Sequence, residues 1–370
     1  MDEAQLPALM HQVLWAVFGL AVLFGAISQR TRFCTMGAIA DVVTMGDWRR
    51  ARMWAVAIAV AVLAFNGMAA LGVLDAGGSI YTGPRVLWLS GLLGGAVFGF
   101  GMVLASGCIS RNLVRLGGGN LKSLVVLLVA AVAAGATLRG LTAVLRVATV
   151  EKVYVELPAG QSLPRVLAAA FQGTETSWML ATAALLAGGL VAWVLSRREG
   201  RGADVWLAGA GVGALVAALW WVSGHLGFLP EDPRTLEPAY LVTNSRRMES
   251  ISTIAPVAYA LDWLLMFSDQ SKTLTLGIVT VAGIVVGAAL MAWRDGSFRW
   301  EGFAGVEDLG LHLAGATCMG VGGIVAMGCT IGQGITGVST LSIGSFIALA
   351  GMVAGALLGL RYQAWRLDRL

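Results

Sequence analysis

Two glycine–cysteine pairs are the first candidates for functional residues in this sequence. The first is Gly107-Cys108 in "LASGCISRNL", and the second is Gly328-Cys329 in "GIVAMGCTIGQGITG". Each pair follows an apolar run of about 20 residues, the length at which a helix spans a bilayer. A thiol is a weak hydrogen-bond donor and a weak acceptor, so either cysteine could hold a ligand briefly and release it.

The other two cysteines have different surroundings. Cys34 lies just after Arg30 and Arg32 in "SQRTRFCTMGAIADVV", where the residues support packing and function equally. Cys318 has no polar neighbour beyond Thr317, and we expect it to pack as a small buried hydrophobe. The chain has no C-x-x-C pair, so neither a metal finger nor a thioredoxin-like motif is indicated.

An internal repeat relates the two glycine–cysteine pairs. With an offset of 221 residues, six of fifteen aligned positions are identical: Gly94, Gly99, Gly101, Ala105, Gly107 and Cys108 fall on Gly315, Gly320, Gly322, Ala326, Gly328 and Cys329. Four residues after each cysteine stands a carboxamide, Asn112 in one copy and Gln333 in the other. This repetition favours a functional role for Cys108 and Cys329 over simple packing.

The composition identifies the class of protein that must position these residues. Hydrophobic residues make up 57% of the chain and charged residues 12%, whereas soluble proteins have about a quarter charged residues. Fifty glycines suit closely packed transmembrane helices. The basic residues lie at the ends of apolar segments, which indicates membrane topology rather than nucleic-acid binding. The start, "MDEAQLPALMHQVLW", lacks a basic leader region, so we expect the first apolar segment to remain as a helix.

Nine apolar segments are long enough to span a membrane. Basic segments follow the first, third, fifth, seventh and ninth of them, which predicts that these connections are cytoplasmic, the N-terminus periplasmic and the C-terminus cytoplasmic. The expected spans are roughly 11–28, 53–74, 86–106, 121–143, 177–196, 205–223, 273–293, 309–328 and 342–360.

The repeat and the spans together predict an all-α integral membrane protein with an inverted-topology internal repeat. The third and eighth spans carry the repeated motif and, being five apart, run in opposite directions, as in many secondary transporters. We expect one transmembrane domain, 1–370, with a first repeat at about 11–143, a linking helix at about 177–196 and a second repeat at about 205–360. The next apolar segment begins 13 residues after Cys108 and after Cys329, which indicates broken or re-entrant helices there.

Three cysteine-centred segments carry a family resemblance. "RTRFCTMGAIADVV", "FGFGMVLASGCISRNLVRLGGGNLKSL" and "GVGGIVAMGCTIGQGITGVSTLSIGSFIALAGM" resemble the YeeE/YedE sulfur-transport family of bacterial inner-membrane proteins, whose characterised members import thiosulfate. The resemblance implies an hourglass-shaped fold of nine spans with three pathway cysteines, here Cys34, Cys108 and Cys329. It also implies a TusA-like sulfurtransferase as a cytoplasmic partner.

The resemblance leaves the substrate open within one chemical class. The long segment 224–272 and the wording of the first motif suit the YedE-like branch, for which selenium-related roles have been suggested. Thiosulfate has a soft terminal sulfur, which thiols can hold weakly, and three hard oxygens. We expect helix N-termini and the side chains of Asn112, Gln333 and Thr330 to meet those oxygens.

Arg246 and Arg247 are the adjacent arginine pair that the predicted topology leaves on the outer side. They either belong to an ordinary solvated loop or raise the local concentration of an anion at an outer vestibule.

Other classes of function fit less well. A thiol oxidoreductase would present closely paired cysteines, and a metal transporter would place His and carboxylate ligands within the spans. His312, near Glu307 and Asp308, comes closest, and acidic residues that stabilise a helix N-terminus explain this cluster more simply. The chain has no Walker A loop. We therefore expect a transporter rather than an enzyme, without cofactor or metal, and the residues leave a covalent persulfide relay open as its mechanism.

Overall fold

The computed structural model describes residues 5–233 and 235–369, and long helices dominate it. Fourteen α-helices are present in this part of the chain: α1 Leu6–Thr31, α2 Thr35–Met45, α3 Arg49–Ala70, α4 Trp88–Leu104, α5 Ile109–Gly117, α6 Leu121–Arg139, α7 Leu141–Ala148, α8 Leu163–Ala170, α9 Glu175–Leu195, α10 Ala203–Trp221, α11 Ile254–Leu265, α12 Leu276–Arg294, α13 Val306–Val325 and α14 Ile343–Leu367. The protein is therefore all-α, as the sequence predicts.

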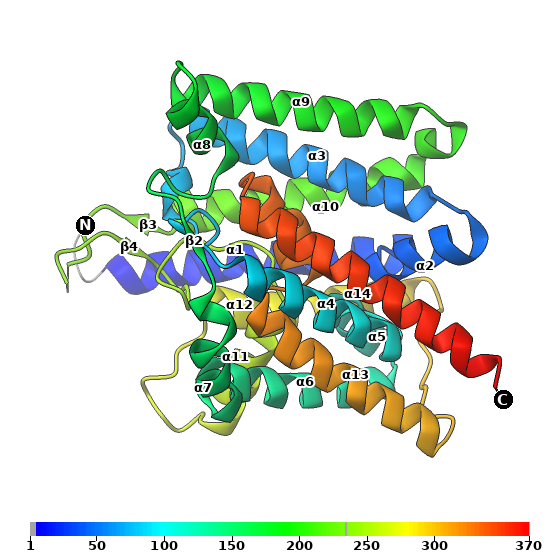
Figure 1. Ribbon diagram of the computed structural model, residues 1–370. Helices are drawn as coiled ribbons and strands as arrows, with labels where there is room; N and C mark the ends of the chain where they lie inside the picture. The colour runs from blue at the N-terminus through cyan, green and yellow to red at the C-terminus, as the bar shows by residue number, and fades with distance from the viewer. Residues whose placement is uncertain (1–4, 234, 370) are drawn as a thin grey trace.

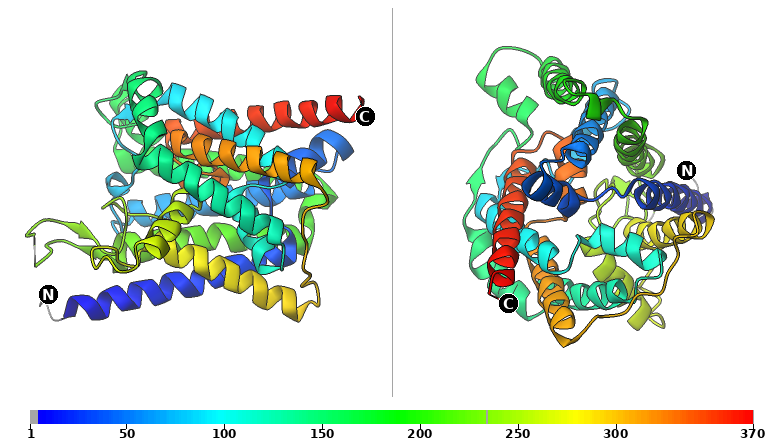
Figure 2. Two further views of the ribbon diagram at one scale, coloured as in Figure 1. Left: turned by 90° about the horizontal axis from the view of Figure 1, so that it is seen from below. Right: turned by 90° about the vertical axis from the view of Figure 1, so that its right-hand side faces the viewer.

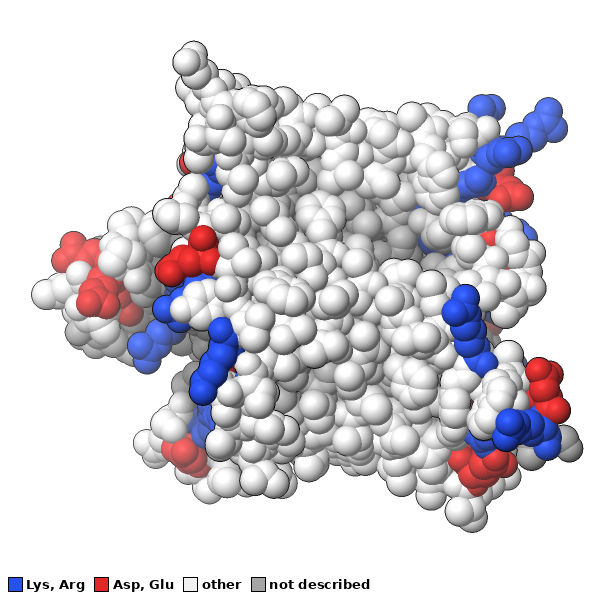
Figure 3. All heavy atoms as spheres, viewed as in Figure 1, with Lys and Arg blue, Asp and Glu red and all other residues white. Residues whose placement is uncertain are grey.

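The described residues contain nine helical segments long and apolar enough to span a membrane. Each overlaps one of the nine predicted spans, and the first and third include the short helices α2 and α5. Charged side chains lie at the two ends of the face in Figure 3, separated by a broad uncharged band. The chain is a multi-pass membrane protein.

The chain ends and the connections between the long helices lie at two opposite ends of the bundle (Figure 1). The N-face is the end at which the described chain begins, together with segments 71–87, 149–162 and 227–253; the C-face is the end at which the chain terminates, together with segments 46–48, 196–202 and 295–305 (Figure 1). Two small antiparallel ribbons lie at the N-face, Arg85–Val86 (β1) with Val155–Glu156 (β2) and Phe228–Leu229 (β3) with Ala239–Tyr240 (β4).

The short helices α2, α7, α8 and α11 are not among the predicted elements. All four contain fewer than 18 residues, and their apolar runs are therefore too short to be recognised as spans. α11 lies within the long segment 224–272 and packs against α6 and α12. A segment expected to be an outer connection thus contributes part of the helical bundle.

The packing of the long helices has an internal symmetry. α1 packs on α12 as α10 packs on α3, and α4 packs on α14 as α13 packs on α6 (Figure 2). The two motif-bearing helices, α4 and α13, pack on each other. This set of packed pairs stays the same when α1 is exchanged with α10, α3 with α12, α4 with α13 and α6 with α14. An inverted repeat requires this symmetry. The exact division into repeats and linking helix stays a prediction.

Candidate functional site

Three cysteines occupy the same local position, at a break between a long helix and a short one. Cys34 precedes α2, Cys108 precedes α5, and Cys329 precedes a short helix over 330–339 that contains the π-helical turn Gly332–Gly337. All three are buried, with Cys108 and Cys329 each 1% exposed. The predicted helix breaks after α4 and α13 are therefore present, and α1 has a third.

A left-handed residue lies two positions before each cysteine. Arg32, Ser106 and Met327 have φ values of 54°, 55° and 58°, a conformation that costs free energy in a non-glycine residue. The shared strain indicates that the surrounding structure fixes all three breaks.

The breaks after α4 and α13 also have the same hydrogen bonds. The N–H groups of Ser106 and Gly107 donate to Val103 and Met102, and those of Met327 and Gly328 donate to Ile324 and Gly323 at 2.8–3.2 Å. This is the Schellman pattern that ends many helices, and it recurs at the 221-residue offset of the sequence repeat. The repeat therefore specifies one backbone geometry twice.

Each sulfur atom contacts a donor at the start of its short helix. Sγ of Cys34 accepts the N–H of Gly37 at 3.4 Å, and Sγ of Cys329 accepts the N–H of Gly332 at 3.3 Å. Cys329 Sγ also accepts the hydroxyl of Thr253 at 3.2 Å. Because these contacts use the sulfur lone pairs, the S–H hydrogen of each thiol remains available for a ligand.

Two of the motifs share the pattern Cys-Thr-x-Gly, which sequence analysis missed. In Cys34–Gly37 and Cys329–Gly332 the glycine N–H meets the cysteine sulfur, and both threonine hydroxyls, of Thr35 and Thr330, are buried without a hydrogen-bond partner. Cys108 differs, because its sulfur contacts the hydroxyl of Ser110 at 3.2 Å.

The two predicted carboxamides stabilise the breaks. The amide of Asn112 donates to the carbonyls of Gly107 and Cys108 at 3.0 Å, and that of Gln333 donates to Ala326 at 2.7 Å. The side-chain oxygen of Gln333 is buried and has no partner. Their amide N–H groups are therefore engaged by the backbone, while the Gln333 oxygen and the Thr330 hydroxyl are free.

The three cysteine motifs meet at one central hollow. It is lined by Cys34 of the first motif, Ser110 of the second and Ile331 of the third. Further lining comes from α1 and α3, and the full set is Phe24, Ser28, Phe33, Cys34, Thr35, Trp54, Ser110, Val114 and Ile331. The hollow leaves no room for a water-sized sphere, so it is a constriction.

Arg111 is a charged residue near this constriction and lies outside the predicted spans 86–106 and 121–143. It lies in α5, directly after Ser110, which lines the constriction, and its Nη1 is buried without a hydrogen-bond partner. Its position three residues after Cys108 is the feature of the sequence that could have identified Arg111 as a candidate site residue.

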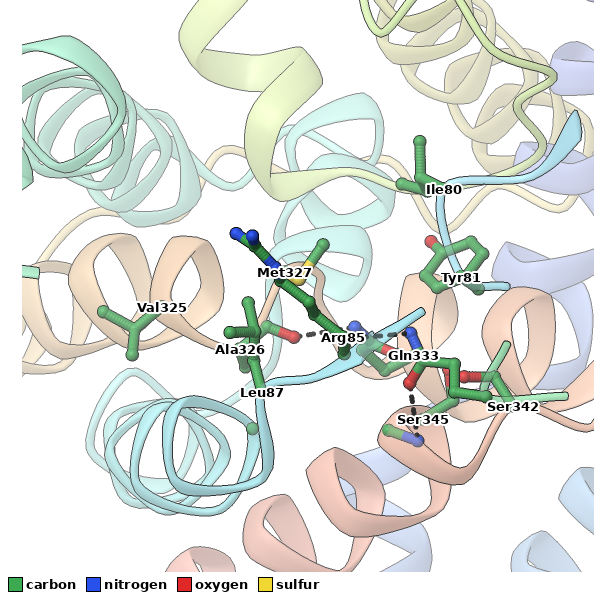
Figure 4. Close-up of a pocket in the computed structure, with 13 residues that line it drawn as sticks. Ile80, Tyr81, Arg85, Leu87, Val325, Ala326, Met327, Gln333, Ser342 and Ser345 are labelled. Atoms are coloured by element: carbon green, nitrogen blue, oxygen red, sulfur yellow. Dashed lines mark hydrogen bonds between the residues drawn. The ribbon is translucent and has the colours of Figure 1, made fainter. Parts of the chain in front are cut away.

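A cavity opens from the N-face toward the Cys329 break. Figure 4 shows Ile80, Tyr81, Arg85 and Met327 around it, with Gln333 bonded to Ala326. Burial raises the pKa of the Tyr81 phenol, which therefore stays a neutral hydrogen-bond donor.

A second cavity of about 230 Å³ adjoins the first and is also lined by Ile80, Tyr81 and Met327. It reaches Gly328, directly before Cys329, and Glu249 lines its wall. Burial raises the pKa of Glu249, although its carboxylate accepts the N–H of Ser245 at 2.8 Å. The N-face therefore has space for a small solute beside the Cys329 motif.

The predicted pair Arg246 and Arg247 is exposed at the N-face, but the two side chains diverge. Arg247 donates to the carbonyl of Ser79 at 3.4 Å. Arg246 lines a third cavity, of about 330 Å³, together with Arg139 and Lys272. Asn244 and Tyr259 line both this cavity and the one that reaches Gly328, so the two adjoin.

The remaining candidates lie away from the breaks. Cys318 is half-buried in α13, in the contact with α4. His312 is bonded to Asp308, which also pairs with Lys122 at 2.7 Å, and Glu307 pairs with Arg366. Within 5–233 and 235–369, no three His, Cys, Asp or Glu residues form a group that could hold a metal ion.

Comparison with known proteins points to one family. A family model described as sulphur transport matches residues 30–358. The chain is 25% identical to the thiosulfate transporter TsuA of Escherichia coli K12 over 341 residues, 90% of each chain, and 25% identical to that of Spirochaeta thermophila over 375 residues, 93% of this chain and 97% of the relative. It is also 31% identical to the probable transporter YedE of Escherichia coli K12 over 96 residues, 24% of this chain and 22% of that relative. The chain therefore belongs to the sulphur transport family, the YeeE/YedE family that its cysteine motifs predict.

Proposed function

We propose that this protein imports thiosulfate, or a closely related sulfur-containing anion, along a pathway that passes Cys329, Cys108 and Cys34. The observation that carries the proposal is the convergence of three motifs of one geometry on a single constriction, together with cavities at the N-face that reach the Cys329 break. The names of the two long relatives favour thiosulfate as the solute.

The thiols suit a soft anion in transit. The sulfur atoms of Cys34 and Cys329 accept backbone N–H groups at helix starts, so the S–H hydrogens of these two thiols can point toward the solute. A thiol is a weak donor, and conduction requires binding that is strong enough to admit an ion and weak enough to release it. The N-termini of the short helices add partial positive charge. No step of this pathway needs a covalent bond.

The orientation is also part of the proposal. The C-face carries the basic segments that follow the odd-numbered spans, and the positive-inside rule assigns that face to the cytoplasm of a bacterial inner membrane. Solute would then enter at the N-face, and a TusA-like sulfurtransferase would receive sulfur at the C-face.

Uptake in cells that lack other sulfur importers tests the proposal. Cells that express this protein should accumulate labelled thiosulfate faster than cells with an empty vector, and faster than they accumulate sulfite, sulfide or selenium analogues. Preferential uptake of a selenium compound would instead favour the YedE-like alternative, and uptake of none of these solutes would contradict the proposal.

Glu249 should make solute capture dependent on pH. Its pKa is raised above the ordinary value, so the carboxyl is neutral at low pH and becomes charged as pH rises through that raised value. Thiosulfate stays a dianion throughout, and a charged Glu249 repels it. Glu249→Gln keeps an acceptor for Ser245 and should lower the apparent KM at pH values above the raised pKa of Glu249, while the two proteins converge as the pH falls below it. A KM difference that does not change with pH would contradict this role.

Arg246 and Arg247 should affect only the capture of the anion at the N-face and not its passage through the protein. Replacing Arg246 and Arg247 together by glutamine should raise the apparent KM at low ionic strength with little change in Vmax, because salt screens such steering over about 8 Å under physiological conditions. Arg246→Gln should reproduce most of the effect, and Arg247→Gln little of it, because Arg246 lines the cavity. Wild-type KM at both low and high salt would show that the pair is an ordinary solvated loop.

A further inference from the structure

The constriction contains donors that the thiol pathway does not use. Ser28 of α1, Thr35 of α2 and Trp54 of α3 are 2%, 6% and 7% exposed and all line the central hollow. Ser28 Oγ, Thr35 Oγ1 and Trp54 Nε1 are buried without a hydrogen-bond partner. An unpaired buried polar group destabilises a fold, and three around one hollow are not explained by stability.

The chemistry of these groups selects a class of ligand. An indole N–H can only donate, and a hydroxyl can donate. Within the described part of the chain, no residue that lines the hollow carries a carboxylate, and Arg111, which follows the lining residue Ser110, has a buried Nη1 without a hydrogen-bond partner. A set of neutral donors beside a cation fits the oxygen atoms of a small oxyanion.

Trp54 is held in place by two of the cysteine motifs. Its ring stacks on Phe33, with ring centroids 5.1 Å apart and planes at 13°. Its far edge lies against Gly334 of the third short helix, where an added Cβ would meet the indole at 3.2 Å. The direction of the indole N–H is therefore fixed before any ligand arrives, which reduces the cost of ordering it.

We propose that Ser28, Thr35 and Trp54 form an oxyanion subsite at the constriction, which binds the oxygens of the transported anion while Cys34 donates to its sulfur. The inference rests on the proposed function. Because a water-sized sphere does not fit in the hollow, the side chains must part and the ion must shed water to pass. The three donors replace that water, as protein groups do in selectivity filters, and they therefore act on the rate of passage.

The test uses the full-length protein in proteoliposomes with labelled thiosulfate. Trp54→Phe and Thr35→Val should each lower Vmax by about tenfold or more, as expected for a lost hydrogen bond to a charged group, and leave the apparent KM within about twofold. Thr35→Val should keep or exceed the wild-type Tm, because it removes an unpaired buried donor and nearly keeps the shape of the side chain. Trp54→Phe also removes packed ring atoms, so its Tm should fall somewhat.

Matched controls remove donors that the fold already uses. Trp206→Phe deletes an indole N–H that donates to Gly200 at 3.1 Å, and Thr280→Val deletes a hydroxyl that donates to Leu276 at 2.8 Å. Both controls should keep the wild-type Vmax.

Three outcomes would count against the subsite. An unchanged Vmax in both Trp54→Phe and Thr35→Val overturns it, and a parallel fall of Vmax and Tm in Thr35→Val overturns it in favour of a structural role. If wild-type protein takes up no thiosulfate, the proposed function fails and the subsite fails with it. Wild-type uptake that the two variants do not alter contradicts the subsite alone.

Discussion

Cys329→Ala and Cys108→Ala should each reduce thiosulfate uptake to background, a loss of about 100-fold, whereas Cys318→Ala should leave most of it. Removing a hydrogen bond to a charged group costs up to about 3 kcal/mol, and alanine leaves the sulfur end of the anion without the thiol that we propose holds it. Cys318 lies in the contact of α13 with α4, away from the three breaks. Initial uptake rates, normalised to the amount of protein in the membrane, measure the three effects.

Serine at the same positions separates two mechanisms. A hydroxyl keeps a hydrogen bond but cannot form a persulfide, so Cys108→Ser should retain substantial uptake if the thiols act only as donors. Background uptake in Cys108→Ser, with normal expression, would favour a covalent relay. Equal losses in Cys108→Ala, Cys329→Ala and Cys318→Ala would leave the pathway without support.

Gly355→Ala should sharply reduce the yield of folded protein. Gly355 of α14 contacts α4 so closely that an added Cβ would overlap the carbonyl oxygen of Ala96. Gly99, on α4, meets the backbone of Met352 in the same way. Overpacking typically costs about 1–3 kcal/mol, and here two helix backbones must separate, so we expect a loss at the upper end of that range. The fraction of protein that remains monodisperse after heating in detergent measures the effect.

Gly189→Ala is the matched control for this variant. Gly189 lies in α9, another transmembrane helix, and an added Cβ there would meet no atom within 4 Å. Alanine is the better helix former by up to about 1 kcal/mol, so Gly189→Ala should be neutral or stabilising. Equal stability of Gly355→Ala and Gly189→Ala would show that close approach of α4 and α14 is not required.

The sequence alone predicts the class of fold and the positions of the breaks. Nine apolar runs of membrane length predict nine spans, because no other structure satisfies backbone groups in lipid as simply as a helix. The repeated Gly-Cys pairs predict the two breaks after α4 and α13, and the structure confirms both of them. Family membership is confirmed as well.

The residues that line the constriction could not be predicted from the sequence. Ser28, Trp54 and Ser110 are distant in the chain, and only the crossing of α1, α3 and α5 brings them together. Their types are ordinary for membrane helices, so nothing distinguishes them from packing residues before the contacts are known. The predicted third span ends at residue 106 and does not include Arg111, whereas the break at Cys108 lets a second, short helix begin before it.

The residues that line the N-face cavities could also be predicted only in part. Arg246 was recognised by its place in a pair, yet its neighbours in the structure, Arg139 and Lys272, come from distant segments. The Cys-Thr-x-Gly pattern, by contrast, was readable in the sequence. It was missed because the 221-residue repeat does not align Cys34 with Cys329.

Position-specific labelling of thiosulfate tests the central claim, passage of the whole anion along the three thiols, most directly. Purified wild-type protein in proteoliposomes would receive thiosulfate labelled either at the terminal sulfur or at the oxygen-bearing sulfur. The account predicts saturable accumulation of both labels at equal rates, and loss of both in Cys329→Ala. Accumulation of the terminal sulfur alone, or of neither label, would contradict it.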